Sequence, residues 1–142
     1  MAGDSTFKVL NSLHRMTLKA TGGRFGWKLR GMQVVELTTL GRRSGEPRTV
    51  MLTSPLTEGD AIVIIASRGG NDHHPAWYLN LVANPEVSVS LRGRPAVPMT
   101  ARVASEAERS ALWPRIVAKY KPYDGYQEKS ARQIPVVLLE AR

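Results

Sequence analysis

Residues 41–48, which we call the arginine loop, concentrate residue types that bind anions. Their sequence, GRRSGEPR, carries three guanidinium groups and one hydroxyl on a turn with two glycines. Arginine side chains match phosphate or carboxylate oxygens two at a time, and glycines leave backbone N–H groups open to a ligand. A basic hairpin turn that merely faces solvent would have the same composition. The motif alone leaves these two interpretations equally open.

A second turn of related composition follows the most apolar segment of the chain. Residues 66–70, which we call the glycine turn, read ASRGG and combine a hydroxyl, an arginine and two glycines. Backbone without side chains could again approach a ligand there. Two such turns at strand ends of one small domain favour ligand binding. Neither is a Walker loop, because no Gly-Lys-Ser/Thr follows, and the chain contains no G-x-G-x-x-G.

Three of the four tyrosines recur at every third residue, as Tyr120, Tyr123 and Tyr126. In a helix this spacing would indicate core packing. Pro122 and Gly125 between them favour a loop or loose turn instead, where amphipathic rings can line the pocket of a planar ligand. We predict such a pocket, to which Trp77 and Tyr78 could add a wall, although Trp77 fits a core position at least as well.

Other catalytic and metal-binding patterns are weak. The run Asp72-His73-His74 is not predicted to bind a metal, because neighbouring side chains point different ways and a third ligand is missing. No G-x-S-x-G elbow supports a serine hydrolase, and no carboxylate pair suggests a glycosidase. The absence of cysteine excludes disulfides, thiol nucleophiles, Cys-ligated zinc and iron–sulfur clusters.

Length and charge fit these motifs. A chain of 142 residues corresponds to one domain, and its net charge of +8 calls for an anionic partner: nucleic acid, a lipid surface or an acidic small molecule. No apolar run is long enough to span a bilayer, and the first residues do not resemble a signal peptide. We therefore expect a cytoplasmic location.

The remaining sequence indicates mainly short strands. Apolar runs and period-two alternation predict six strands, at residues 34–40, 48–57, 61–66, 87–91, 96–104 and 134–140. Helices are predicted at 76–83 and, from a capping box at Ser105, towards Tyr120, with a kink or split at Pro114. Short turns without regular alternation of strands and helices favour an antiparallel barrel or sandwich.

Residues 1–31 are predicted to form a separate N-terminal unit ahead of a cofactor-binding domain at 32–142. An apolar stripe that includes Phe7 and Leu10 lies beside Lys8, Arg15 and Lys19, and glycines follow it. This pattern fits an amphipathic helix in peripheral contact with a membrane, and equally a helix packed on its own barrel or on a second copy in a homodimer.

Taken in order, these segments resemble the actinobacterial deazaflavin-dependent nitroreductases, a branch of the split β-barrel flavin and deazaflavin oxidoreductases. The matching segments lie at 40–48, 66–70, 75–85, 113–114, 120–126 and 132–137. The resemblance implies a mainly β (α+β) fold, a six-stranded antiparallel split β-barrel with an N-terminal helix and two flanking helices. It also implies hydride transfer from reduced coenzyme F420, a deazaflavin with a phosphate and an oligoglutamate tail. The acceptors would be quinones, nitroaromatics or other electron-poor molecules such as enones and lactones.

The resemblance also implies roles for particular positions. The phosphate and tail would be held by Arg42, Arg43, Ser44 and Arg48. The deazaflavin would be bracketed by Thr49, Val50, Met51, Leu52, Thr53, Ile65, Ala66, Ser67 and Arg68. Its other side would be closed by Ala76, Trp77, Tyr78, Leu79 and Asn80. The predicted catalytic residues are Ser67 near the reacting ring and, on the substrate side, Tyr120, Tyr123 and Tyr126, of which Tyr123 would also contact the cofactor.

Two departures from the family pattern bear on substrate preference. Lys121 separates the first tyrosine from Pro122, and Met51 stands where a proline is common. Two alternatives stay open. A flavin-mononucleotide oxidoreductase would share the barrel but would not need so many tail-binding arginines. A nucleic-acid-binding barrel would interleave basic residues with exposed aromatics on its strands, whereas the aromatics here cluster elsewhere.

Overall fold

The structure, a computed structural model, describes residues 28–29 and 31–142, which form one antiparallel sheet and three α-helices. The strands are β1 (Lys28–Leu29), β2 (Met32–Leu40), β3 (Pro47–Ser54), β4 (Leu56–Glu58), β5 (Ala61–Ile65), β6 (Glu86–Ser90), β7 (Val97–Val103) and β8 (Val136–Ala141). The helices are α2 (Ala76–Ala83), α3 (Glu106–Lys119) and α4 (Pro122–Lys129), with a 3-10 turn, η1 (Arg68–Gly70), after β5. The expected N-terminal helix lies outside the described residues.

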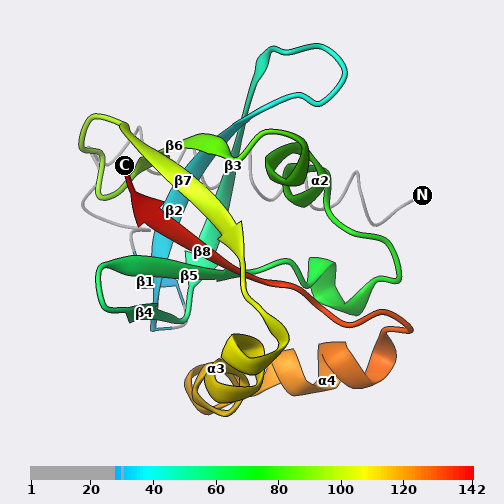
Figure 1. Ribbon diagram of the computed structural model, residues 1–142. Coiled ribbons are helices and arrows are strands. Elements are labelled where there is room, and N and C mark those ends of the chain that lie inside the picture. The colour runs from blue at the N-terminus through cyan, green and yellow to red at the C-terminus, as the bar shows by residue number, and fades with distance from the viewer. Residues whose placement is uncertain (1–27, 30) are drawn as a thin grey trace.

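The sheet curls into a half-barrel (Figure 1). Hydrogen-bonded neighbours follow the order β1-β2-β6-β7-β8-β5-β4, and β3 pairs with β2 off this path. Within the described residues no ladder joins β3 to β4, so the sheet stays open between them. The fold is therefore mixed α+β with an antiparallel half-barrel. No helix among residues 28–29 and 31–142 is long and apolar enough to cross a membrane.

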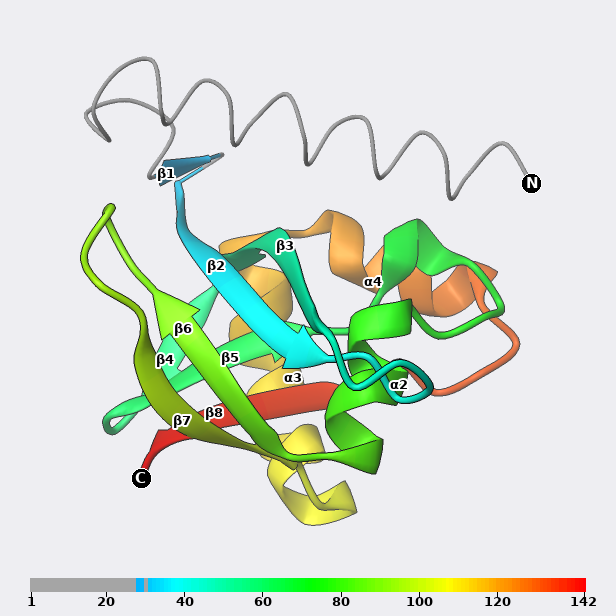
Figure 2. The same ribbon diagram turned by 90° about the horizontal axis from the view of Figure 1, so that it is seen from above.

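Helices pack against both faces of the sheet, because alternate side chains of each strand point to opposite sides. On one face, Trp77 and Leu81 of α2 join a cluster of buried residues from β2, β5, β6, β7 and β8. On the other, Leu112 of α3 and Tyr123 of α4 pack with β5 and β8 (Figure 2). Strand β5 is buried along its whole length as a result, which explains its continuous apolar run.

The prediction of six strands is wrong, because the segment expected as one strand at 48–57 forms two. Pro55 ends β3, since proline has no N–H to continue the ladder. The break is stabilised by Ser54, whose buried Oγ donates to the carbonyl oxygens of Val63 at 2.7 Å and Leu56 at 2.9 Å. The two-residue strand β1 is the other addition to the predicted set.

Two of the three helices begin as the sequence predicts. Helix α2 covers the predicted residues, and α3 opens with the predicted capping box. Pro114 does not split α3. The proline costs about 3 kcal/mol in a helix interior, whereas burying Leu112 and Ile116 stabilises the helix by about 1.5–3 kcal/mol each.

The predicted loop at the three tyrosines is also wrong, because the chain forms α4 there. Pro122 occupies the first turn of the helix, where its missing N–H is tolerated, so this proline begins a helix rather than preventing one. The ring of Tyr123 lies edge-on to those of Tyr120 and Tyr126, at centroid distances of 5.1 and 6.0 Å. The three-residue spacing thus packs the tyrosines together, with Tyr123 at the centre.

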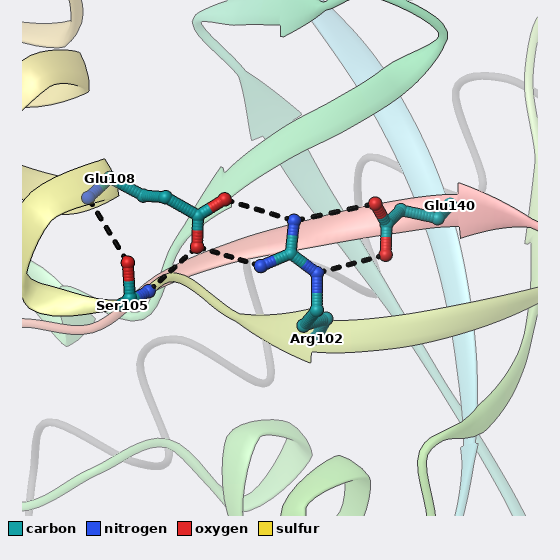
Figure 3. A network of polar contacts seen from close by, with 4 residues as sticks. All are labelled: Arg102, Ser105, Glu108 and Glu140. Carbon is teal, nitrogen blue, oxygen red and sulfur yellow. Dashed lines mark hydrogen bonds and ion pairs between the residues drawn. The ribbon is translucent and has the colours of Figure 1, made fainter.

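A polar network ties the start of α3 to the sheet (Figure 3). Arg102 of β7 donates through Nη1 and Nη2 to both carboxylate oxygens of Glu108, at 2.7 and 3.0 Å, and through Nε to Glu140 of β8 at 3.0 Å. Ser105 completes the capping box, because its N–H donates to Glu108 and its Oγ accepts the Glu108 N–H. The guanidinium of Arg102 thereby links the start of α3 to β7 and β8.

We expect this network to lose its effect on stability in acid. The Arg102 hydrogen bonds, followed by those of Ser105, lower the pKa of Glu108 to about 2. A carboxylate whose pKa is lower when folded stabilises the protein above its unfolded pKa, and that stability is lost as pH falls from about 4.5 to about 2. Glu108→Gln should therefore melt below the wild type at pH 7, and their melting temperatures should converge towards pH 2. A difference in melting temperature that stays constant between pH 7 and pH 2 would show that the charge of Glu108 does not stabilise the network.

Candidate functional site

An open cavity of about 640 Å³ lies between the arginine loop and the start of α2. The end of β2, the loop, the start of β3 and α2 all contribute to it, and Figure 2 shows the β2–β3 connection lying beside α2. Three guanidinium groups line one part, and no acidic side chain is among the lining residues. The cavity is lined by Thr39, Gly41, Arg42, Arg43, Ser44, Pro47, Arg48, Thr49, Val50, Ala76, Trp77 and Asn80.

Asn80 of α2 joins the arginine loop to the end of β2. Its side-chain oxygen Oδ1 accepts from both the backbone N–H and the Nη1 of Arg42, each at 3.1 Å. Its Nδ2 donates at 3.1 Å to Oγ1 of Thr39, which is only 1% exposed. Asn80 itself is 4% exposed. A single buried amide thus positions the loop against α2 and the end of β2.

We expect Asn80→Leu to cost about 1–3 kcal/mol of stability, because it leaves the buried Thr39 hydroxyl and the Arg42 N–H without their partner. Asn80→Asp is the matched control, since a carboxylate still accepts from Arg42 and from the Thr39 hydroxyl. In urea denaturation the wild type should have the highest free energy of unfolding, Asn80→Asp a lower one and Asn80→Leu the lowest. A leucine variant as stable as the wild type would show that the amide does not hold the loop.

The conformation of the loop depends on its glycines and on Ser44. Gly45 has φ +72°, which favours glycine, and its N–H donates to the Gly41 carbonyl at 2.8 Å. A Cβ at Gly41 would lie 2.6 Å from the Ser44 Oγ, so a side chain at this position would displace that hydroxyl. The same Oγ accepts from the Glu46 N–H at 3.1 Å and from Nη2 of Arg48 at 3.4 Å. Hydrogen bonds between residues of the arginine loop therefore determine its conformation.

The structure brings together nine of the predicted cofactor-binding residues around this cavity. They are Arg42, Arg43, Ser44, Arg48, Thr49, Val50, Ala76, Trp77 and Asn80. Sequence reasoning missed Thr39 as a lining residue. Its signal was a hydroxyl inside an apolar strand directly ahead of the arginine loop, but only the fold shows that Asn80 lies opposite it.

The other predicted cofactor residues do not line this cavity. Met51, Ile65 and Ala66 are buried in the core, and Leu52 packs against the α2 face. Ser67 and Arg68 belong to the glycine turn, which packs against α4. Thr53, Tyr78 and Leu79 are also outside the lining. Any contact of these residues with a cofactor stays a prediction.

The predicted catalytic tyrosines lie on the opposite face of the sheet from Trp77. Tyr123 is 5% exposed, and its hydroxyl lies 4.0 Å from the Met32 sulfur. Burial raises the pKa of Tyr123 to about 12, so its hydroxyl stays protonated at neutral pH. Tyr120 and Tyr126 pack partly buried against the same cluster. In this structure Tyr123 is a core residue.

The polar run at 72–74 serves local structure. Asp72 accepts the Ala131 N–H at 2.7 Å, and His74 packs against the ring of Tyr78 with centroids 4.7 Å apart. Burial, with the nearby charge of Arg132, lowers the pKa of His74 and favours its neutral form. No group of three or more His, Asp or Glu side chains in the described part of the chain could hold a metal ion.

Fold and site together define a class, a split-barrel protein with an arginine-lined cavity. The sequence matches the family model described as F420H(2)-dependent quinone reductase over residues 11–141, and the chain belongs to that family. It is 36% identical over 135 residues to an F420H(2)-dependent quinone reductase of Mycobacterium tuberculosis strain H37Rv, an alignment that covers 92% of this chain and 89% of that protein.

Two solved structures support the same placement. One, described as an F420-H2 dependent reductase (FDR-A), has a TM-score of 0.66 and 41% identity, and the match covers 75% of this chain and 93% of that one. The other is described as a domain-swapped dimer. It has a TM-score of 0.69 and 36% identity, and the match covers 96% of this chain and 99% of that one.

Proposed function

We propose that this chain takes a hydride from reduced F420 and passes it to a quinone, with the cofactor's phosphate and acidic tail held in the arginine-lined cavity. The donor set fits such a group. Three guanidiniums and the Ser44 hydroxyl supply donors for phosphate and carboxylate oxygens, and the bare Cα of Gly41 leaves the loop compact. This arrangement of positive groups without a lining carboxylate is the observation that carries the proposal.

The residues of the cavity bind and orient rather than react. When bound, the cofactor supplies a two-electron hydride, so the protein needs no redox-active side chain of its own. Arg42, Arg43 and Arg48 would fix the anionic end, while Val50 and Trp77 offer apolar surface at the same cavity. Fixing one end of a long ligand limits the positions that its other end can take, which favours hydride transfer by orientation.

We infer that the acceptors extend beyond quinones to nitroaromatics and other electron-poor molecules, enones and lactones included. The support is chemical, because any planar electron-poor group held beside the donor can accept a hydride. We keep Ser67 as the proposed residue near the reacting ring, and Tyr120, Tyr123 and Tyr126 as proposed residues of the substrate side. For Tyr123 this role requires a movement that exposes a ring now buried in the core.

Titration of the purified protein with F420, flavin mononucleotide and NADPH tests the cofactor. We expect saturable binding of F420 and much weaker binding of the other two. Oxidation of reduced F420 by a soluble quinone, followed by the return of the visible absorbance of the oxidised deazaflavin, tests the reaction. Tight binding of flavin mononucleotide with none of F420 would overturn the proposal.

We also propose a homodimer, supported by the 36% identical structure described as a domain-swapped dimer. Light scattering over a range of protein concentrations measures the mass, and a monomer at every concentration would contradict it. The expected cytoplasmic location stays a prediction. So does membrane contact, because the helix on which it depends lies outside the described residues.

A further inference from the structure

The glycine turn has a backbone conformation that needs support. Arg68 has φ +48°, a left-handed conformation that is unfavourable for a residue with a Cβ, and Gly69 and Gly70 continue at +63° and +86°. Two hydrogen bonds close the turn, from the Gly70 N–H to the Ser67 carbonyl at 2.9 Å and from the Asn71 N–H to the Arg68 carbonyl at 3.2 Å. The surrounding structure must therefore help to hold it.

Arg132, in the segment ahead of β8, supplies that support. Its Nη2 donates to the carbonyl oxygens of Ala66 and Ser67, both at 3.1 Å. Its Nε donates to the carbonyl oxygen of Asn71, also at 3.1 Å. One guanidinium thus bonds the backbone at both ends of the turn. The rigid planar fork of arginine suits this task, whereas the compact ammonium of lysine does not reproduce it.

The position of Arg132 is itself fixed by α3 and α4. Gln127 donates through Nε2 to the Arg132 carbonyl at 2.8 Å and accepts the Ile134 N–H through Oε1 at 2.8 Å. Arg109 of α3 donates to that same Oε1 and to the Ile134 carbonyl, both at 2.8 Å. The two helices therefore hold the segment from which Arg132 reaches the turn.

The electrostatics around the turn favour a negative ligand. Burial, and then the charge of nearby Arg68, lower the pKa of Arg132, although the carboxylate of Asp72 partly opposes this shift. The Nη1 of Arg132 is buried without a hydrogen-bond partner among the described residues. Buried donors of this kind are rare unless a water or a ligand atom meets them. Two neighbouring guanidiniums and an unused donor thus suit an anionic or strongly polar group.

We propose that Arg132 is a positioning residue, which holds the glycine turn in the conformation that presents Ser67 and Arg68 to the bound cofactor. This inference rests on the proposed function, because F420 is the ligand that the turn would meet. No step in it requires Arg132 to touch the reacting atoms. Arg132 acts through the three carbonyl oxygens, and loosening the turn is the effect that its removal should have.

Hydrogen exchange on the cofactor-free protein tests directly whether Arg132 stabilises the glycine turn. In Arg132→Met the amides of Gly70 and Asn71 should exchange about ten times faster than in the wild type, because the turn loses three carbonyl contacts. The Gly45 amide, in the arginine loop, serves as an internal reference that should not change. Unchanged exchange at Gly70 and Asn71 would overturn the proposal.

Binding of F420 provides the second measurement. We expect its Kd to rise about tenfold in Arg132→Met, which corresponds to about 1.4 kcal/mol. Arg142→Met is the matched control, because it also removes a guanidinium that donates to backbone carbonyls, but these belong to Met99 of β7 and Val87 of β6 and not to the turn or to the segment that holds Arg132. It should lower the melting temperature while leaving the Kd and the exchange of Gly70 near the wild-type values. Equal Kd changes in both variants would mean that Arg132 acts only on stability.

Arg132→Lys separates positioning from charge and is the variant to interpret if Arg132→Met does not fold. It keeps the positive charge but not the fork, so we expect faster exchange of the turn amides and weaker F420 binding than in the wild type. Full recovery of both by lysine would overturn the proposal. A wild type that fails to bind F420 would instead refute the proposed function. The hydrogen-exchange result would still show whether Arg132 stabilises the conformation of the glycine turn.

Discussion

Arg42→Gln combined with Arg43→Gln is expected to weaken F420 binding by about thirty- to a hundredfold. Each arginine is exposed, so we assign it about 1 kcal/mol or slightly more, below the 1.5–3 kcal/mol of a shielded charge-assisted hydrogen bond. Added salt should weaken the wild-type complex as well, because the Debye length falls from about 10 Å at 0.1 M to about 3 Å at 1 M. Fluorescence or absorbance titration measures both effects.

The same two substitutions at Arg92 and Arg94 provide the control. This second exposed pair lies on the β6–β7 turn, and the antiparallel register of β2 with β6 places that turn at the other end of β2 from the arginine loop. The Arg92/Arg94 double variant should change the affinity for F420 little. Longer glutamate tails should strengthen binding to the wild type and less so to the Arg42/Arg43 variant. Equal losses at both pairs would mean that net charge, rather than the cavity, attracts the cofactor.

Tyr123→Ala is expected to destabilise the protein by about 3–5 kcal/mol, the usual cost of deleting a large buried aromatic ring. For a chain of this length we expect the melting temperature to fall by about 10 °C or more. A role on the substrate side alone would predict a loss of turnover with little loss of stability. The burial of the ring between Tyr120 and Tyr126 is the reason that we expect a large loss of stability instead.

Tyr123→Phe keeps the ring and removes only the hydroxyl near Met32. It should retain most of the stability, with a loss of about 1 kcal/mol, as for one hydrogen bond. Thermal denaturation and quinone reduction, measured on both variants below their melting temperatures, separate the two roles. An alanine variant that melts like the wild type but has lost turnover would return Tyr123 to the substrate site.

Local chemistry was enough to predict much of the fold and the arginine loop. The capping box at Ser105 was readable because the N–H groups of a first helical turn need nearby oxygens, whatever the rest of the fold. Helix α2 was bounded by Pro75 and by Asn84-Pro85, which act through local backbone geometry. The arginine loop was recognisable because guanidiniums and glycines bind anions with groups that lie close in sequence.

Long-range packing decided the rest. The tyrosine triplet carries a proline and a glycine that favour a loop, yet α4 forms because burying Tyr123 against β5 and β8 outweighs the cost of about 1 kcal/mol for Gly125. Thr39 and Asn80 are distant in sequence, and only the fold places them together.

The sequence by itself therefore determined the family, the arginine loop and most of the strands. Only the tertiary structure decided which polar side chains meet and which aromatic rings are buried, because those contacts join elements that local sequence does not relate.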